Sequence, residues 1–457
     1  MLTITQHTSR EDCLRISGRM DLMKQIGFLL LCLCMLFPTG AQAASMMEVS
    51  YWEARAGVLG DSELAGRDEI GQMNAAIREK DTLSVDFSAY PEELSGDVVS
   101  SYIKEATPSA DGLSELGKGG AVSRLTSEDV DELLALRNLE DVPAVVPVRY
   151  AVTVTRANLR FLPTATAWVD ASGVRKEDRL QGTAVDPAEP LAVLMDSDDK
   201  KFCFVQMRNY RGWVSKDDIA FTDRGTWMNY AAPSRFLVVT ANLAMVDVGG
   251  RKEIFQMGSR IPLIDHAWQT WKIAMPAADA SGRLVEKRVS VPHDVKIFHE
   301  GWLSYTTNNI IRQSFRFLGD AYGWGGLDNS VDSSALVADV YRTVGIELPR
   351  DSARQELAMS HRVELPPILT EDERNSVIAS AMPGSLLFQP GQVSVLLGTT
   401  HEGKPMVLQA LYQCGASGLN GTEMQYPCRV LLSSLALLGD DGRTFCKRIT
   451  SVGTMIP

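Results

Sequence analysis

The spacing of apolar residues changes along the chain and predicts three kinds of segment. From about residue 46 to 145, stretches such as GRDEIGQMNAAIREK and TSEDVDELLALRNL repeat apolar positions every three or four residues, which indicates amphipathic helices between Pro- and Gly-containing breaks. After Pro147, short β-branched or aromatic runs such as KFCFVQMRN alternate with turn residues, which is typical of a small antiparallel β domain. A second set of such runs follows. Both sets end in a Gly-Trp-Val or Gly-Trp-Leu tripeptide, at Trp213 and Trp302, which indicates a weak internal repeat.

The pattern becomes helical again from Thr306, and the segments SLLFQ, QVSVLLG and PMVLQAL after it predict strands. Helices followed by an antiparallel sheet are the order of an α+β fold. One helix of this part has an apolar face at helical spacing, formed by Leu336, Val337, Val340, Tyr341 and Val344. Gly345 stands where a C-terminal cap belongs, so Asp332, Ser333 and Ser334 lie at the helix start.

The residues at this helix start are suited to two different roles. Side-chain oxygens there accept hydrogen bonds from free backbone N–H groups, so simple capping accounts for Asp332, Ser333 and Ser334. The positive end of the helix dipole also favours anions and thiolates, which is the environment of many reactive cysteines.

The stretch from Tyr322 to Gln355 reads YGWGG, then DSSAL, then GIELPRDSARQ. It resembles the NlpC/P60 family of cell-wall cysteine peptidases, whose members read Y-x-W-G-G, then D-C-S-G/A-L at a helix start, then G-I-x-L-P-R-D-S-x-x-Q. The two β segments resemble the paired SH3b modules that precede the catalytic domain in secreted γ-D-glutamyl-L-diamino acid endopeptidases of this family. The resemblance implies an α+β fold in which a papain-like NlpC/P60 domain follows two SH3-like β-barrel modules and a helical N-terminal region.

The residue patterns and the resemblance together give the domain boundaries that we expect. We expect a signal peptide at residues 20–44, the helical region at 45–145, the first SH3b-like domain at 146–235, the second at 236–304 and the NlpC/P60-like domain at 305–457.

The three catalytic positions of the family differ in this chain. Ser333 stands at the place of the family's cysteine, Gln392 in FQPGQVSVLLG at that of the histidine base, and Gln409 in PMVLQALY at that of the second histidine. A serine hydroxyl needs an adjacent base, and a glutamine amide neither accepts a proton nor passes one on. We therefore expect a catalytically silent site. Strand alternation places both glutamines near Ser333 if their faces meet the helix start.

A ligand-binding part of the site is expected to survive. By motif match, four residues correspond to those that help to bind the free amino end of an L-Ala-γ-D-Glu-diamino acid peptide in the family: Asp332, Ser334, Asp351 and Ser352. Carboxylates suit an ammonium group in a partly closed pocket, although all four residue types also cap helices. Tyr322 and Trp324 are expected to be pocket-wall or core aromatics.

Three functions are open at this point. The first is a pseudoenzyme that binds peptidoglycan stem peptide or muropeptide and regulates or positions an active cell-wall hydrolase. The second is an active γ-D-glutamyl-L-diamino acid endopeptidase that uses Ser333 with an unrecognised base. The third is a scaffold whose SH3b modules bind a partner. A histidine or carboxylate at hydrogen-bonding distance from Ser333 would favour the second function. A pocket blocked at Asp332 and Asp351 would favour the third. No histidine of the chain falls in a strand that faces Ser333: His7, His266, His293, His299, His361 and His401.

Charge and composition narrow the class of partner. The net charge of −12 argues against a nucleic-acid partner and gives no basic patch for a membrane surface. Residues 20–44 read as a secretory signal peptide, with Lys24 before an apolar run and the small residues Ala41 and Ala43 at a cleavage site. We therefore expect an exported protein of the periplasm or cell envelope that starts at Met20 or Met23 and keeps no membrane anchor after cleavage.

Cysteine usage leaves one question open. The expected mature chain keeps Cys203, Cys414, Cys428 and Cys446, and a bridge between Cys414 and Cys428 or buried thiols both fit an exported protein. No C-x-x-C pair or His-rich cluster indicates zinc, and we expect no cofactor.

Overall fold

The structure is a computed structural model that describes residues 46–118, 124–170, 177–418 and 421–456. It divides into two units at Arg55, and the first unit carries helix α4 (Val49–Ala56). The signal peptide expected at residues 20–44 lies outside the described residues, so export stays a prediction. Over the ranges that the structure describes, no helix is long and apolar enough to cross a bilayer.

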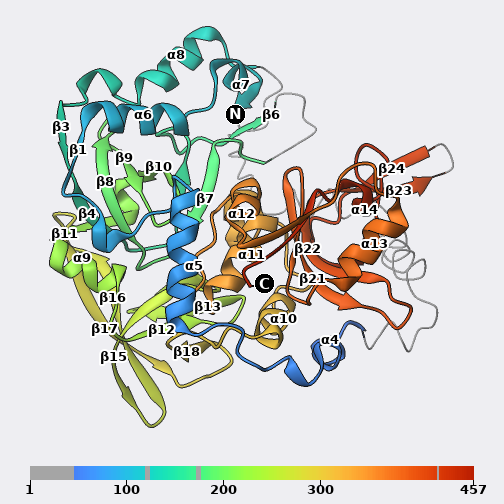
Figure 1. Cartoon of the computed structure of the whole chain (residues 1–457). Helices are drawn as coiled ribbons and strands as arrows, with labels where there is room; N and C mark the ends of the chain where they lie inside the picture. The colour runs from blue at the N-terminus through green and yellow to red at the C-terminus, as the bar shows by residue number, and fades with distance from the viewer. Residues whose placement is uncertain (1–45, 119–123, 171–176, 419–420, 457) are drawn as a thin grey trace, which may run out of the picture. The chain divides into compact units, whose positions relative to one another are not determined.

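The second unit begins with the helical region that the apolar period predicts, shown in blue to teal in Figure 1. Its helices are α5 (Arg67–Lys80), α6 (Gly96–Ala106), α7 (Ala110–Ser114) and α8 (Ser127–Ala135). Helix α8 begins at a capping box, because Thr126 and Asp129 each accept a hydrogen bond from the other's backbone N–H. Two short sheets accompany the helices: β1 (Glu93–Ser95) with β3 (Val145–Pro147), and β2 (Leu116–Lys118) with β6 (Trp168–Asp170).

The first β module is a seven-stranded antiparallel sheet of order β11-β4-β8-β9-β10-β5-β7. Its strands are β4 (Arg149–Thr153), β5 (Ala157–Arg160), β7 (Gln181–Val185), β8 (Pro190–Asp196), β9 (Phe202–Gln206), β10 (Arg211–Ser215) and β11 (Ile219–Thr222). Trp213 of the first Gly-Trp-Val tripeptide lies on β10, where it is fully buried against Phe204.

The second β module follows helix α9 (Arg224–Ala231) and has two sheets. A five-stranded sheet has the order β17-β16-β15-β12-β18, and a two-stranded sheet pairs β13 with β14. The strands are β12 (Phe236–Val239), β13 (Leu243–Val248), β14 (Arg251–Gln256), β15 (Arg260–Ala267), β16 (Thr270–Ala278), β17 (Leu284–Pro292) and β18 (Phe298–Glu300). Trp302 lies after β18 rather than in a strand, and its ring packs on Phe236.

The expectation of closed β-barrels is wrong for the described residues. The seven-stranded sheet ends at β7 and β11, which do not pair with each other. The free edge of β7 is instead covered by the turn η5 (Trp324–Asn329) of the C-terminal part, since Trp324 Nε1 donates to the carbonyl of Gln181 at 3.1 Å. Covering an edge with another segment removes the need to close the sheet on itself.

The C-terminal part has the predicted α+β order. Its sheet is antiparallel and six-stranded, with the order β19-β26-β20-β21-β22-β25. The strands are β19 (His361–Glu364), β20 (Leu386–Gln389), β21 (Gln392–Thr399), β22 (Pro405–Leu411), β25 (Arg429–Ser434) and β26 (Ser451–Thr454), and a separate hairpin joins β23 (Cys414–Gly418) to β24 (Gly421–Gln425). The helices are α10 (Thr307–Phe315), α11 (Ser333–Arg342), α12 (Ser352–Ala358), α13 (Glu371–Ser380) and α14 (Phe445–Arg448).

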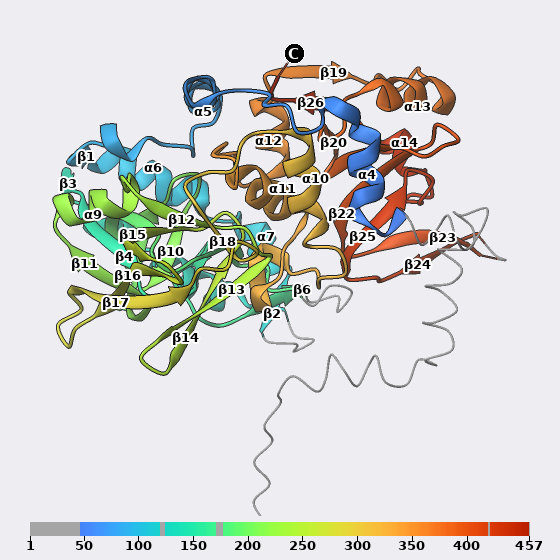
Figure 2. The ribbon, with the colours of Figure 1, turned by 90° about the horizontal axis from the view of Figure 1, so that it is seen from below.

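Helix α11 is the central helix of this part and packs on β21, β22, α10 and α12 (Figures 1 and 2). Its predicted apolar face is buried over its whole length: Leu336, Val337, Val340, Tyr341 and Val344. The helix ends at Arg342 with Thr343 as its C-cap, and Gly345 follows two residues after that cap with a left-handed φ of 90°. The packing of α11 directs its first residues toward the loop that contacts the first β module.

Candidate functional site

Ser333 is the first residue of α11 and is 7% exposed. Asp332 is the N-cap, and its Oδ1 accepts a hydrogen bond from the Ala335 backbone N–H at 2.9 Å. The chain reaches this point through η5, where Gly325 and Gly326 have φ values of 58° and 76°. A side chain at Gly325 would also place a Cβ 2.6 Å from Gln181 Cγ on β7. The Trp-Gly-Gly motif is therefore required where this loop passes the edge of the first β module.

The Asp332 carboxylate is held mainly by Arg350. Arg350 Nη2 donates to Oδ2 at 2.6 Å and Nη1 to Oδ1 at 3.1 Å, and the Gly325 N–H donates to Oδ2 at 3.0 Å. Burial opposes ionisation of this carboxyl, but the charge and hydrogen bonds of Arg350 bring its pKa below the ordinary value. Asp332 therefore ties the Gly-Gly turn, the helix start and the Leu-Pro-Arg segment together as a buried anion.

Ser334 belongs to the same network. Its hydroxyl accepts from Arg350 Nη1 at 2.9 Å and donates to Asp332 Oδ1 at 3.1 Å. Gln355 Nε2 donates to the carbonyls of Ser334 and Pro349 at 2.9 and 2.8 Å. The sequence analysis did not predict that Arg350 binds Asp332 and Ser334. Its position inside the motif, next to Asp351, was the only sequence feature that pointed to it. A role of Asp332 and Ser334 in ligand binding stays a prediction.

Asp351 and Ser352 begin helix α12 on the other side of Arg350. The Asp351 side chain is 46% exposed and makes no capping hydrogen bond, and its ion-pair partner is Arg354 Nε at 3.8 Å. Burial raises the pKa of Asp351 against the lowering effect of the nearby arginines. The charge of Asp351 in turn raises the pKa of Tyr210 in the first β module, after the larger effect of burial. A carboxylate with an open side therefore lies where the first module meets α12.

The two glutamines are hydrogen-bonded to each other, and their expected proximity to Ser333 stays a prediction. Gln392 is the first residue of β21 and Gln409 lies on β22, where it is 1% exposed. Gln392 Nε2 donates to Gln409 Oε1 at 3.3 Å and to the carbonyl of Ala410 at 3.1 Å. Gln409 Nε2 donates to Ser433 Oγ on β25 at 2.8 Å. The result is a continuous row of two amides and one hydroxyl on β21, β22 and β25, of which β21 and β22 pack against α11. Sequence reasoning missed Ser433, which lies on an adjacent strand.

Among the residues that the structure describes, no histidine or carboxylate is hydrogen-bonded to the Ser333 hydroxyl. His361 lies on the exposed strand β19 and His401 in an exposed turn. The other described histidines belong to the second β module: His266, His293 and His299. His361 thus lies in a strand, although the sequence indicated only a position after a helix, and His7 lies outside the described residues.

The two predicted aromatics flank the helix start differently. Trp324 is fixed by its hydrogen bond to Gln181, and the guanidinium of Arg179 lies over its ring, 4.7 Å from the ring centroid. Tyr322 packs on Tyr412 with ring centroids 5.7 Å apart. Both aromatics are half-buried, which fits the expected pocket wall.

Cys414 and Cys428, for which the sequence left a bridge or buried thiols open, both lie near this region. Cys414 is buried and Cys428 is exposed, and both are present as thiols. The Cys428 thiol lies 3.5 Å from the carbonyl of Tyr412.

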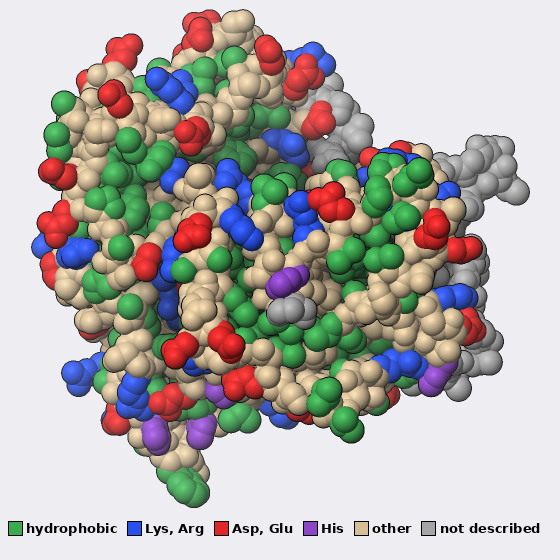
Figure 3. Space-filling model, viewed as in Figure 1, with side chains coloured by type: hydrophobic (Ala, Val, Ile, Leu, Met, Phe, Trp, Pro, Cys, Tyr) green, Lys and Arg blue, Asp and Glu red, His purple; other side chains and the backbone are tan. Residues whose placement is uncertain are grey.

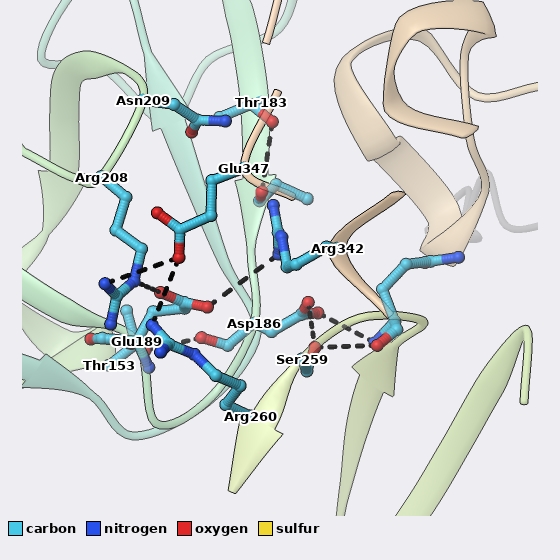
Figure 4. A network of polar contacts seen from close by, with 12 residues as sticks. Thr153, Thr183, Asp186, Glu189, Arg208, Asn209, Ser259, Arg260, Arg342 and Glu347 are labelled. Carbon is cyan, nitrogen blue, oxygen red and sulfur yellow. Dashed lines mark hydrogen bonds and ion pairs between the residues drawn. The ribbon is translucent and has the colours of Figure 1, made fainter. Parts of the chain in front are cut away.

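A second polar network, drawn in Figure 4, lies around Arg342 at the C-terminal end of α11. Glu347 faces Arg208 of the first module at 3.8 Å and Arg260 of the second at 3.7 Å, and its pKa is lowered by these arginines although burial opposes this. Glu189 lies 3.7 Å from Arg208 and 4.0 Å from Arg342 at the end of α11. A cavity of about 40 Å³ beside this network is too small for more than a few waters. These contacts join both β modules to the helix that begins at Ser333.

Surface charge on the face drawn in Figure 3 is mixed, with Lys and Arg side chains interspersed among Asp and Glu. Interspersed charge of this kind gives no continuous track for a phosphate backbone on that face.

Two parts of the chain match models of known protein families. Residues 319–413 match the model of the NlpC/P60 family, and residues 175–215 match the SH3 domain of SH3b1 type. No curated protein matches the chain. Among solved structures, the chain is similar to a novel NlpC/P60 endopeptidase from Photobacterium damselae subsp. piscicida, with a TM-score of 0.67 and 18% identity over 87% of this chain and 95% of that one. It is also similar to an NlpC/P60 family protein from Bacillus cereus ATCC 10987, with a TM-score of 0.40 and 14% identity over 61% of this chain and 83% of that one.

Both family matches fall inside the expected domains, the SH3b match within 146–235 and the NlpC/P60 match within 305–457. The exact domain boundaries stay predictions. At 18% identity, the similarity to the endopeptidase structure shows the fold alone.

Proposed function

We propose that this chain, which matches the NlpC/P60 family over residues 319–413 and the SH3 domain of SH3b1 type over residues 175–215, is an exported pseudoenzyme that binds peptidoglycan stem peptide without cutting it. The observation that carries the proposal is the hydrogen-bonded row of Gln392, Gln409 and Ser433 on β21, β22 and β25. The apolar segment within residues 20–44 supports export to the cell envelope.

The row of amides explains why cleavage is not expected. A hydroxyl nucleophile must give its proton to a base in the transition state, and the leaving amine must receive one. Gln392 uses its amide N–H groups on Gln409 and on a backbone carbonyl, and neither amide titrates near neutral pH. Loss of a general base alone reduces a rate by about 10²- to 10⁴-fold. Ser333 also has no described carboxylate or histidine partner that would replace the base.

Binding is supported by the acidic groups that remain beside Ser333. Both carboxylate oxygens of Asp332 accept hydrogen bonds from Arg350. Asp332 therefore contributes to ligand binding mainly because it holds the loops in place. Asp351 keeps an open side and lies near Tyr210, and a free ammonium group is a suitable partner for it. The occupation of Asp332 favours a second candidate function, an interaction scaffold whose β modules bind a partner. The open side of Asp351 favours peptide binding over that candidate.

The test is calorimetric titration of the mature protein with L-Ala-γ-D-Glu-diaminopimelate, with mass spectrometry of the same samples. We expect binding without release of diaminopimelate. Asp351→Asn should weaken binding by roughly tenfold, because a charge-assisted hydrogen bond is lost. Asp265→Asn, on a distant exposed hairpin of the second β module, is the matched control and should bind like the original protein.

The pH dependence of the binding affinity gives an independent readout in the same titration. The raised pKa of Asp351 means that its carboxylate forms at higher pH than usual, so affinity for the amine should rise with pH through that pKa. Release of diaminopimelate that disappears in Ser333→Ala would overturn the proposal in favour of an active hydrolase. Neither binding nor release would favour the scaffold.

A further inference from the structure

Strand β19 forms an open edge of the C-terminal sheet. Among the described strands it is the last of the six and pairs with β26 alone. All four of its residues are exposed, and Val363 keeps 55% of its surface. The opposite edge, β25, is covered, because the Gly319 N–H donates to the Val430 carbonyl at 3.0 Å and the Val430 N–H to the Asp320 carbonyl at 2.8 Å. The fold therefore covers one edge of this sheet and leaves β19 at its rim (Figure 2).

The hydrogen bonds to β26 decide which backbone groups of β19 point outward. In an antiparallel pair, the residues of a strand face the partner strand alternately. The Leu365 N–H donates to the carbonyl of Thr450, the residue before β26, at 2.8 Å, so Val363 also faces β26. The backbone N–H and C=O groups of Arg362 and Glu364 therefore point away from the sheet, and within the described ranges no hydrogen bond reaches them.

The side chains of this edge carry opposite charges two residues apart. Arg362 Nη2 donates to Glu364 Oε1 at 2.7 Å, so these two side chains lie on one face of the strand and Val363 lies on the other. Many edge strands are protected against pairing by lysines, by a proline within the strand or by a bulge. Strand β19 contains no lysine or proline, and its register with β26 is regular.

Two copies of β19 are complementary in one antiparallel register. When Val363 lies opposite Val363 of a second copy, Arg362 of each copy lies opposite Glu364 of the other. These two pairs carry the outward backbone groups, so they are the hydrogen-bonded pairs of the ladder. A slide of two residues in either direction places Arg362 opposite Arg362 or Glu364 opposite Glu364, which is unfavourable. A slide of one residue places outward groups opposite residues that already face β26.

We propose that β19 is an interface at which two copies of this chain associate as a two-fold dimer, with their C-terminal sheets joined edge to edge. This inference does not depend on the proposed function. Two exposed apolar side chains flank the strand in sequence, Leu357 at 61% and Ile368 at 87%, and they add apolar surface for a second copy to cover. Strands β26 and β20 separate β19 from β21, which carries Gln392, so the contact does not use the glutamine row.

The first measurement is sedimentation equilibrium of the full mature chain at concentrations from about 1 µM to about 1 mM. The contact is short, so we expect a weak dimer with a dissociation constant on the order of 10 to 100 µM, as for a small transient interface. Amide hydrogen exchange of the same samples should show protection of the Arg362 and Glu364 N–H groups that increases with protein concentration.

Charge reversal tests the register. Arg362→Glu or Glu364→Arg alone places like charges opposite each other in both symmetric pairs, so each variant should dimerise roughly 10- to 100-fold more weakly. An equimolar mixture of the two variants should recover the original affinity as a heterodimer, because each variant carries the charges that the other lacks. Glu300→Arg, at an exposed strand carboxylate of the second β module that pairs with Arg235 at 2.8 Å, is the matched control and should dimerise like the original protein.

Three results would overturn the inference. The first is a chain that stays monomeric at about 1 mM. The second is a dimer that neither charge reversal weakens, since it then uses another surface. The third is protection of the Arg362 and Glu364 amides that does not depend on concentration, which would show that another segment of the same chain covers the edge. If a variant does not fold, the exchange measurement on the original protein still decides the question.

Discussion

Asp339 on helix α11 makes the stability of this protein dependent on pH near neutrality. The residue is buried beside Arg342, and burial raises its pKa from the ordinary 3.8 to about 7, with Asp186 adding to the rise and Arg342 opposing it. A raised pKa means that the neutral carboxyl stabilises the folded state. This contribution is complete below the pKa of the unfolded chain and is lost as the pH rises through about 7.

The size of the effect follows from these two pKa values. Each tenfold change in proton affinity corresponds to about 1.36 kcal/mol, so ionising Asp339 in the folded protein costs about 4 kcal/mol more than in the unfolded chain. Between pH 5 and pH 8 the unfolded chain has already released this proton while the folded chain releases it gradually. Integration over that range gives a loss of about 2 to 3 kcal/mol in the free energy of unfolding.

Asp339→Asn removes this titration and keeps the shape of the side chain. The free energy of unfolding from urea denaturation should therefore rise, relative to the original protein, by about 2 to 3 kcal/mol more at pH 8 than at pH 5. Asp223→Asn is the matched control. Hydrogen bonds from Thr226 lower the pKa of Asp223, so its contribution is lost only in acid and should be equal at the two pH values. An Asp339→Asn effect that is the same at pH 5 and pH 8 would refute the reasoning.

Three further changes test the contacts around the site. Ser333→Cys alone should release no diaminopimelate in a mass-spectrometric assay, because Gln392 still cannot act as the base; measurable release would contradict this. Arg350→Gln should lower the free energy of unfolding by about 3 to 5 kcal/mol, since Asp332 is left as a buried anion without its partner; a loss below about 1 kcal/mol would show that the pair is not needed. Glu347→Gln should cost about 3 kcal/mol in urea denaturation at pH 7 because two arginines lose their counter-charge, and the effect should shrink in acid, where the lowered pKa of this carboxyl is passed.

Local pattern was enough to predict the elements that carry the candidate site. The apolar face of residues 336–344 and Gly345 placed the helix that begins at Ser333, because a period near 3.6 and a glycine with positive φ are local properties. The strand patterns predicted the two strands that carry Gln392 and Gln409, and in the structure these two side chains are hydrogen-bonded to each other. The motif between Tyr322 and Gln355 predicted a resemblance to the NlpC/P60 family, and residues 319–413 match the model of that family.

The closed β-barrels were predicted wrongly for a reason that is not local. Strand runs and turns indicate that strands exist, but the pairing of the two edges of a sheet depends on what else approaches them. Here the loop at Trp324, more than a hundred residues away in sequence, covers the edge of β7.

The sequence by itself determined the order of the elements, the family of the C-terminal domain, and the residue types Ser333, Gln392 and Gln409 at the start of one helix and on two strands. Only the tertiary structure decided which charges are available. It showed that Asp332 is already held by Arg350, that Asp351 keeps an open side, and that the Arg179 guanidinium lies over the Trp324 ring. The physical reason is that hydrogen bonds and ion pairs join side chains that approach only after the chain has folded, and no period or spacing along the sequence encodes those partners.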